Sequence, residues 1–153
     1  MARVAGIVPI LLVMIFLCGC ARHQKVTEIS LERKGCLGPC RVCKVTLRGD
    51  GSAIYVGKEN VDHNGTFGND KFWPIASEFS QLADAIDMAG FFRLAGEYGV
   101  GWVDAEVVVT TVTRNGQTKT VTTHNSSKDP KELWLVDTLI DGVVAKVHWV
   151  KQD

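Results

Sequence analysis

An apolar run near the N-terminus sets the limits on what this chain can fold into. The residues from Val4 to Leu17 are almost all apolar, and Arg3 precedes them as a short positive segment. The run is shorter than the roughly 20 residues that a helix needs to cross a bilayer. A cleaved secretion signal therefore explains it better than a membrane span. We expect residues 1–19 to form a signal peptide and to contribute nothing to the folded protein.

The signal ends in Leu17-Cys18-Gly19-Cys20, which resembles the lipobox of bacterial lipoproteins. That motif has an aliphatic residue, two small residues and a cysteine that is acylated. Cys18 stands where alanine or serine is commoner. The resemblance implies lipid on Cys20, and several acyl chains at about 0.8 kcal/mol per buried methylene make a permanent anchor. Ala21 follows the cysteine, which in similar Gram-negative lipoproteins favours the outer membrane.

Removal of residues 1–19 leaves 134 of the 153 residues, enough for one domain with its own hydrophobic core. Residues 20–25 are expected to form the lipidated cysteine and a short polar tether, and residues 26–153 a single domain. The full chain carries 17 basic and 17 acidic residues, a balance that gives no electrostatic footprint for nucleic acid. The expected partners are the membrane, through the lipid, and a protein of the envelope on the periplasmic side.

Alternating apolar and polar residues predict strands in two parts of the chain. Residues 26–33, 41–48 and 52–57 form the first group, with Gly49-Asp50-Gly51 as a turn. Residues 107–113 and 118–123 form the second group, which is rich in β-branched side chains. The dipeptide Asn115-Gly116 between them is a strong hairpin signal. Residues 58–71 are polar and contain glycine, and they are interpreted as a loop or an irregular edge of the sheet.

Helical spacing of apolar residues appears twice. Residues 74–90 begin with a proline and end with a glycine, which suit the first turn and the C-terminal cap of a helix. Residues 130–147 form the second helical segment. The order strand, strand, strand, helix, strand, strand, helix shows no sustained βαβ alternation. It predicts an α+β fold, in which two helices cover an antiparallel sheet of about five strands.

The strand ending in Leu31-Glu32-Arg33 is followed by Gly35-Cys36-Leu37-Gly38-Pro39-Cys40, and later by Gly49-Asp50-Gly51 and Tyr55-Val56-Gly57. This series resembles a family of bacterial envelope proteins, many of them lipoproteins, that is catalogued as a domain of unknown function. The family signature is Gly-Cys-x-Gly-x-Cys-Pro-x-Tyr, and Arg41 and Cys43 replace its proline and tyrosine here. The resemblance supports the expected fold and implies no activity.

The three cysteines after Cys20 reach an oxidising compartment, where disulfides persist. The favoured arrangement is a Cys36–Cys40 disulfide that closes the turn after the first strand. Cys43 would then remain a buried apolar thiol on the strand face of Val45 and Leu47. Alternatives are a redox pair of Cys40 and Cys43, a structural zinc site, and the cluster-binding triad of radical S-adenosylmethionine enzymes, whose cysteine spacing is the same.

Candidate functional residues outside the cysteines are few. The four histidines lack the spacing of metal ligands. Asp104 and Glu106 could form a carboxylate pair, but no nucleophile or base accompanies them, so a solvated strand end is favoured. Trp102, between Gly101 and Val103 in a glycine-rich loop close to Asp104, is the candidate anchor for a partner, because exposed aromatic residues concentrate binding energy. The alternative is that it caps the hydrophobic core, as loop tryptophans often do.

Together these features favour a non-catalytic protein-binding module in the cell envelope, with no catalytic residue, metal or cofactor. One concrete form is an inhibitor or immunity lipoprotein that neutralises a toxin or a cell-wall hydrolase. The alternatives are a periplasmic thiol oxidoreductase and an assembly factor for outer-membrane machinery.

Overall fold

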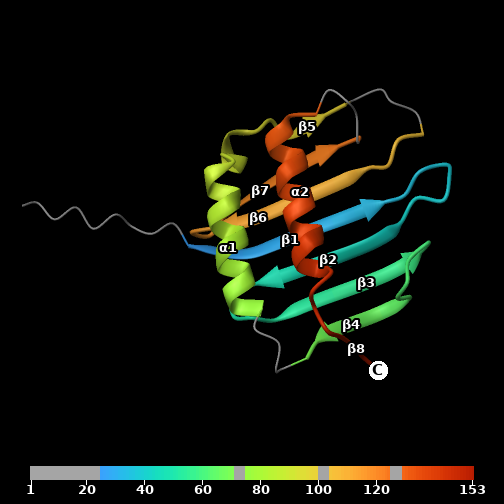
Figure 1. Ribbon diagram of the computed structural model, residues 1–153. Coiled ribbons are helices and arrows are strands. Elements are labelled where there is room, and N and C mark those ends of the chain that lie inside the picture. Colours follow the sequence, from blue (N-terminus) through green and yellow to red (C-terminus); the bar gives the residue numbers. More distant parts are fainter. Residues whose placement is uncertain (1–24, 71–74, 100–103, 125–128) are drawn as a thin grey trace, which may run out of the picture.

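A computed structural model describes residues 25–70, 75–99, 104–124 and 129–153, and it shows two helices on one sheet (Figure 1). Within these residues the sheet has eight strands in the order β5-β7-β6-β1-β2-β3-β4-β8. The strands are β1 (Val26–Lys34), β2 (Val42–Arg48), β3 (Ala53–Glu59), β4 (Gly65–Asn69), β5 (Glu97–Tyr98), β6 (Val108–Arg114), β7 (Gln117–Thr123) and β8 (Trp149–Lys151).

The prediction of an antiparallel sheet of about five strands is wrong, although the fold is α+β. The five strands expected from alternation are present, and β4, β5 and β8 are added to them. β5 pairs with β7 in parallel, so the sheet is mixed. The three additional strands are two to five residues long. Strands this short show no periodic pattern, because pairing with a neighbouring strand, rather than their own side chains, holds them extended.

The central hairpins follow directly from the sequence. β1 pairs antiparallel with both β2 and β6, which places Ile29 beside Leu47 on one side and Val112 on the other. Asn115 and Gly116, with φ of 51° and 77°, turn the chain between β6 and β7. Two consecutive residues with positive φ are what a two-residue hairpin turn requires.

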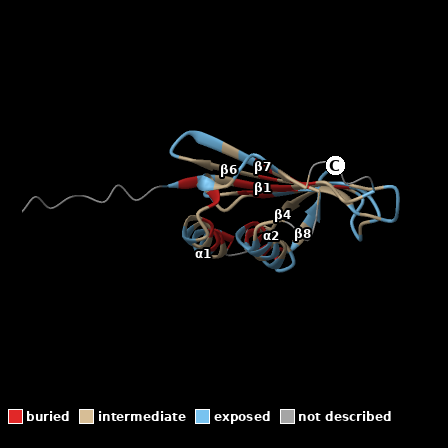
Figure 2. Cartoon of the chain, turned by 90° about the horizontal axis from the view of Figure 1, so that it is seen from above, coloured by how far each residue is buried: buried red, intermediate tan, exposed pale blue. Residues whose placement is uncertain are grey.

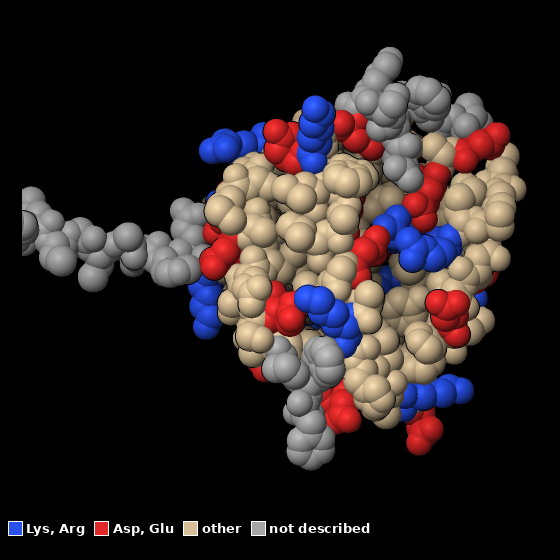
Figure 3. Space-filling view, viewed as in Figure 1, with Lys and Arg blue, Asp and Glu red and all other residues tan. Residues whose placement is uncertain are grey.

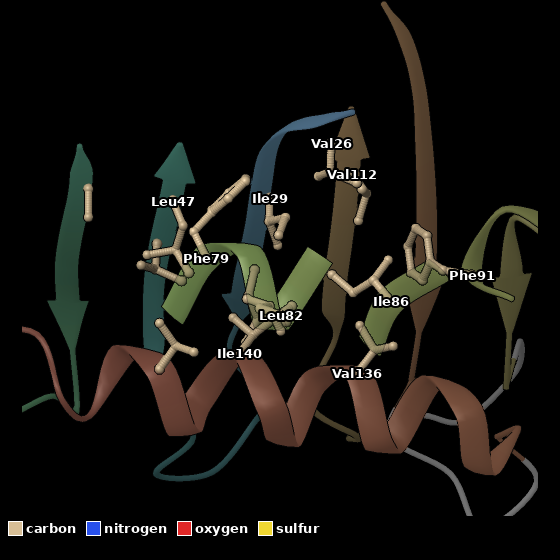
Figure 4. Close-up of a cluster of buried hydrophobic side chains, with 14 of the residues drawn as sticks. Val26, Ile29, Leu47, Phe79, Leu82, Ile86, Phe91, Val112, Val136 and Ile140 are labelled. Carbon is tan, nitrogen blue, oxygen red and sulfur yellow. The ribbon is translucent and has the colours of Figure 1, made fainter. Parts of the chain in front are cut away.

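Helices α1 (Ile75–Met88) and α2 (Lys131–Val144) both lie against the same face of the sheet (Figure 2). α1 is followed by a 3-10 turn, η1 (Phe91–Arg93), whose Phe91 is fully buried. Figure 4 shows Phe79, Leu82 and Ile140 lying between the helices and the strands. α2 ends at Val144, earlier than the expected boundary at residue 147, yet Val147 is still buried. The hydrophobic core therefore occupies the space between the sheet and the two helices.

The two ends of the sheet carry different segments of the chain. At one end, called the proximal end, the backbone N–H of Lys25 donates to Oδ1 of Asn115 at 3.0 Å, and β1 begins. At the other, the distal end, the N–H of Lys34 donates to the carbonyl of Val107 at 2.9 Å, just before the loop 35–41. The nine residues of β1 separate the two ends, a distance of about 30 Å for an extended strand.

Candidate functional site

A disulfide closes the loop at the distal end. Cys36 and Cys40 are joined, with their Cα atoms 5.5 Å apart, which is the pairing favoured from the sequence. The amide of Asn60 donates to the carbonyl of Cys40 at 3.0 Å and fixes the loop to the end of β3. Leu37, within the closed loop, is 86% exposed. The disulfide thus holds a large apolar side chain out in solvent on a short, restricted segment.

Cys43 is a free thiol on β2 and lies only partly buried. It faces the same side of the sheet as Val45 and Leu47, and it pairs across the strands with Arg33 and Gly57. Burial, and then the neighbouring Cys43, raise the pKa of Tyr55 to about 12. The thiol of Cys43 therefore lies beside a phenol that stays neutral at ordinary pH.

Arg33, at the end of β1, is the centre of a charged cluster under α2. Its side chain is 10% exposed. Nη1 donates to Oε2 of Glu106 at 2.8 Å, and Nη2 donates to Oδ2 of Asp141 at 2.6 Å. Burial alone would lower the pKa of Arg33, but the charges of Asp141 and Glu106 outweigh it and raise the pKa. One buried cation therefore links β1, the segment before β6 and helix α2.

Asp137 is the second charge-bearing group of this cluster and, like Arg33, is partly buried. It lies one helical turn before Asp141, so both carboxyl groups face the sheet from α2. The hydroxyl of Thr110 donates to Oδ1 of Asp137 at 2.5 Å. Burial raises the pKa of Asp137 to about 6, against the opposing effects of Thr110 and Arg33. Asp137 can consequently take up or release a proton close to neutral pH.

A cavity of about 370 Å³ opens over the Arg33 cluster. Its lining includes Arg33, Thr123, Lys131, Trp134, Asp137 and Asp141. The hydroxyl of Thr123 also donates to Asp129. Figure 3 shows acidic and basic side chains gathered on this face, beside a hollow in the surface. Most of the charged and hydroxyl groups that line the cavity form hydrogen bonds with one another or with neighbouring residues. Trp134, which is 66% exposed, lies at the edge of the cavity.

The site residues predicted from the sequence outside the disulfide are not brought together in the structure that is described. Cys20 and Trp102 lie outside the described residues. Asp104 is exposed and has a φ of 80°, a backbone conformation that aspartate tolerates better than most residues. Glu106 is not the solvated strand end that was favoured, because its side chain is 14% exposed and pairs with Arg33.

The Arg33 cluster was missed from the sequence. Asp137 and Asp141 are spaced by four residues on a helix whose apolar positions include Val136 and Ile140, so their place at the edge of the buried face was readable. The sequence held no signal that Arg33 and Glu106, 73 residues apart, would meet them.

Residues 27–144 match the model of a protein family described as a domain of unknown function, DUF6438. The chain belongs to the DUF6438 family. The matched range runs from β1 to the end of α2, and β8 lies beyond it. The resemblance drawn from the sequence is confirmed as far as a domain of unknown function, while the lipoprotein character and the cysteine signature stay predictions. Neither a curated protein nor a solved structure matches the chain.

Two further observations concern this DUF6438 domain. Neither helix among the described residues is long and apolar enough to cross a membrane. In the same part of the chain, no three His, Cys, Asp or Glu side chains are grouped so that they could hold a metal ion.

Proposed function

We propose that this DUF6438 protein is a lipid-anchored, non-catalytic binding module of the bacterial cell envelope, which engages a partner protein with its distal end. The anchor would be Cys20, in the outer membrane and facing the periplasm. The observation that carries the proposal is the position of Leu37, an 86% exposed leucine on a disulfide-closed loop. Because the disulfide restricts the backbone of the loop, less conformational entropy is lost when the exposed Leu37 fills a pocket on a partner.

The direction of β1 supports this assignment. The predicted tether from Ala21 to Lys25 reaches at most about 17 Å when extended, and it leads directly into the proximal end of the sheet. β1 then runs about 30 Å away from that end to the loop of Leu37. A lipid on Cys20 would therefore hold the proximal end near the membrane and leave the distal end free to meet a partner.

The Arg33 cluster supports binding rather than catalysis. Both terminal nitrogens of the Arg33 guanidinium donate to carboxylates, and Asp137 accepts a hydrogen bond from Thr110. These bonds join α2 to the sheet next to the distal loop. The cluster thus serves as a rigid support for the loop, which suits an inhibitor or immunity protein that presents a fixed surface.

The anchor is tested by metabolic labelling with a radioactive fatty acid. We expect label on the wild-type chain and none on Cys20→Ala. Equal labelling of the two chains would contradict the anchor.

The binding role is tested with a photoreactive amino acid placed at Leu37 of the anchored chain, and at Gln117 as a control at the proximal end. Gln117 is exposed and begins β7 directly after the β6–β7 turn. We expect a discrete protein adduct from position 37 and none from position 117 after irradiation of intact cells. Adducts of equal yield at both positions, or none at 37, would overturn the proposal.

A further inference from the structure

The face of the sheet that the helices leave open carries a group of basic side chains at its distal end. Alternation along the strands places Lys34, Lys44 and Lys58 on this face, all of them exposed. They line a cavity of about 340 Å³ together with Glu32, Val42 and Val56. We call Lys34, Lys44 and Lys58, with the two valines between them, the lysine surface.

Strand register explains how these residues meet. Lys34 of β1 lies directly opposite Val42 of β2, and Lys44 lies opposite both Glu32 and Val56. Lys58 follows Val56 by two residues on β3, next to the irregular pairing at Val42. Three lysines from three adjacent strands therefore lie close to Val42 on the open face of the sheet.

Like Lys25, Lys119, Lys131 and Lys151, the three lysines of this surface take no part in the ion pairs of the described chain. They differ from those four in lying together on three adjacent strands. On the helix-covered face, Arg33 and Arg114 each pair with a carboxylate at 2.8 Å or less. On the open face, Arg48 pairs with Glu28 at the proximal end. Among the described residues, no ion pair within 4.0 Å involves Lys34, Lys44 or Lys58. Two glutamates lie near the three lysines, Glu32 opposite Lys44 and Glu59 opposite Val42. Three positive charges against two negative charges leave a local excess of one positive charge in a chain that is neutral overall.

The lysine surface is continuous with the disulfide loop. Lys34 and Val42 are the last cross-strand pair of the β1–β2 hairpin, and the loop that carries Leu37 connects them. One continuous surface at the distal end thus combines an exposed leucine, two valines and three unpaired lysines.

We propose that the lysine surface docks an acidic segment of the partner protein, beside the pocket that receives Leu37. The inference rests on the proposed function, because it supplies the chemistry of that same partner. Lysine ammonium groups act as separate point charges, without the planar fork of arginine, and so suit several carboxylates along a segment rather than one bidentate pair. Such a surface also attracts an acidic partner over a distance and speeds its association.

The position of the surface favours a protein over the membrane as its occupant. The lysines lie at the distal end, whereas the predicted tether enters at the proximal end. Contact with anionic lipid would require the sheet to lie flat on the bilayer. Binding to lipid is therefore the competing outcome that the experiment must exclude.

The test uses the full lipidated chain in neutral phosphatidylcholine nanodiscs and a fluorescent decaglutamate peptide as the probe. The variant is Lys34→Gln/Lys44→Gln/Lys58→Gln, which removes the positive charge without adding repulsion. The matched control is Lys25→Gln/Lys119→Gln/Lys151→Gln, which changes the net charge equally but elsewhere. Thermal unfolding of both variants verifies that they are folded.

We expect at least a tenfold weaker affinity for decaglutamate in the first variant, little change in the control, and loss of wild-type binding in 0.5 M salt. Equal affinities of wild type and first variant would overturn the inference. So would tighter, lysine-dependent binding to phosphatidylglycerol vesicles than to decaglutamate. The photocrosslink from position 37 separates the two proposals. If the adduct from position 37 persists at full yield in the triple lysine variant, only the acidic docking segment is contradicted. If no adduct forms from position 37 when the three lysines are present, the binding role itself is contradicted.

Discussion

Nη2 of Arg33 lies 2.6 Å from Oδ2 of Asp141, and this contact joins the end of the central strand β1 to helix α2. The same guanidinium reaches Glu106, before β6, at 2.8 Å. The side chains of Arg33 and Glu106 are 10% and 14% exposed, so water cannot replace this carboxylate without opening the structure, whereas Asp141 is 41% exposed. The cluster therefore has consequences for stability that differ from those of an ion pair on the surface.

Arg33→Met is expected to lower the free energy of unfolding by roughly 3 kcal/mol, because it leaves Glu106 without its cation in a mostly buried site. Asp141 is more exposed and adds less to this cost. The matched control is Arg48→Met, since Arg48 and Glu28 form an ion pair whose side chains are 37% and 43% exposed. Such pairs contribute about 0–1 kcal/mol. Urea unfolding of the three proteins provides the comparison, and equal losses in the two variants would contradict a structural role for the cluster.

Asp137 predicts a specific dependence of stability on pH. Its pKa is raised to about 6 in the folded protein, from 3.8, so the folded state binds its proton more tightly than the unfolded state. The contribution of Asp137 to the free energy of unfolding is therefore fully present below pH 4. It is lost as the pH rises toward and through 6, by up to about 3 kcal/mol. Asp137→Asn cannot ionise and should lack this loss.

The measurement is the free energy of unfolding of wild type and Asp137→Asn at intervals from pH 4 to pH 7.5. The difference between the two proteins should grow in favour of the variant as the pH rises, since every other titrating group is shared. Parallel stability curves would show that Asp137 ionises as freely in the folded protein as in the unfolded chain.

The parts of the fold that local sequence determines were predictable, and the parts that depend on distant contacts were not. Strand alternation located β1, β2, β3, β6 and β7, and apolar spacing located both helices. The segment of β4 was interpreted as a loop or an irregular edge because Gly65 and Gly68 interrupt any pattern, yet its pairing with β3 and β8 holds it extended. Glu106 likewise appeared exposed, since nothing near it in sequence identifies Arg33 as its partner.

The disulfide of the distal loop should contribute a measurable but limited stability. Closing a loop of about five residues removes roughly 2 kcal/mol of chain entropy from the unfolded state. Cys36→Ser/Cys40→Ser is therefore expected to lower the free energy of unfolding by about 2 kcal/mol in urea. Thiol titration of the processed, lipidated wild type in denaturant should find one thiol per chain, that of Cys43. A count that changes reversibly with mild oxidants would instead favour the thiol oxidoreductase.

Close backbone packing explains why the third residue of the Tyr55-Val56-Gly57 motif is a glycine. A Cβ at Gly57 would lie 1.9 Å from the carbonyl oxygen of His63, a backbone atom that cannot move aside without displacing the turn between β3 and β4. Gly57→Ala is therefore expected to lower the free energy of unfolding by about 3 kcal/mol, the upper range for overpacked sites.

The matched control is Gly142→Ala, within α2, where a Cβ has nothing within 4 Å. Alanine is favoured over glycine by about 1 kcal/mol inside a helix, so this change should raise the stability while the first lowers it. Urea unfolding measures both. Because the two variants add the same methyl group, opposite signs would locate the effect in the contact with His63, and a stable Gly57→Ala protein would mean that the β3–β4 turn can shift to admit a side chain.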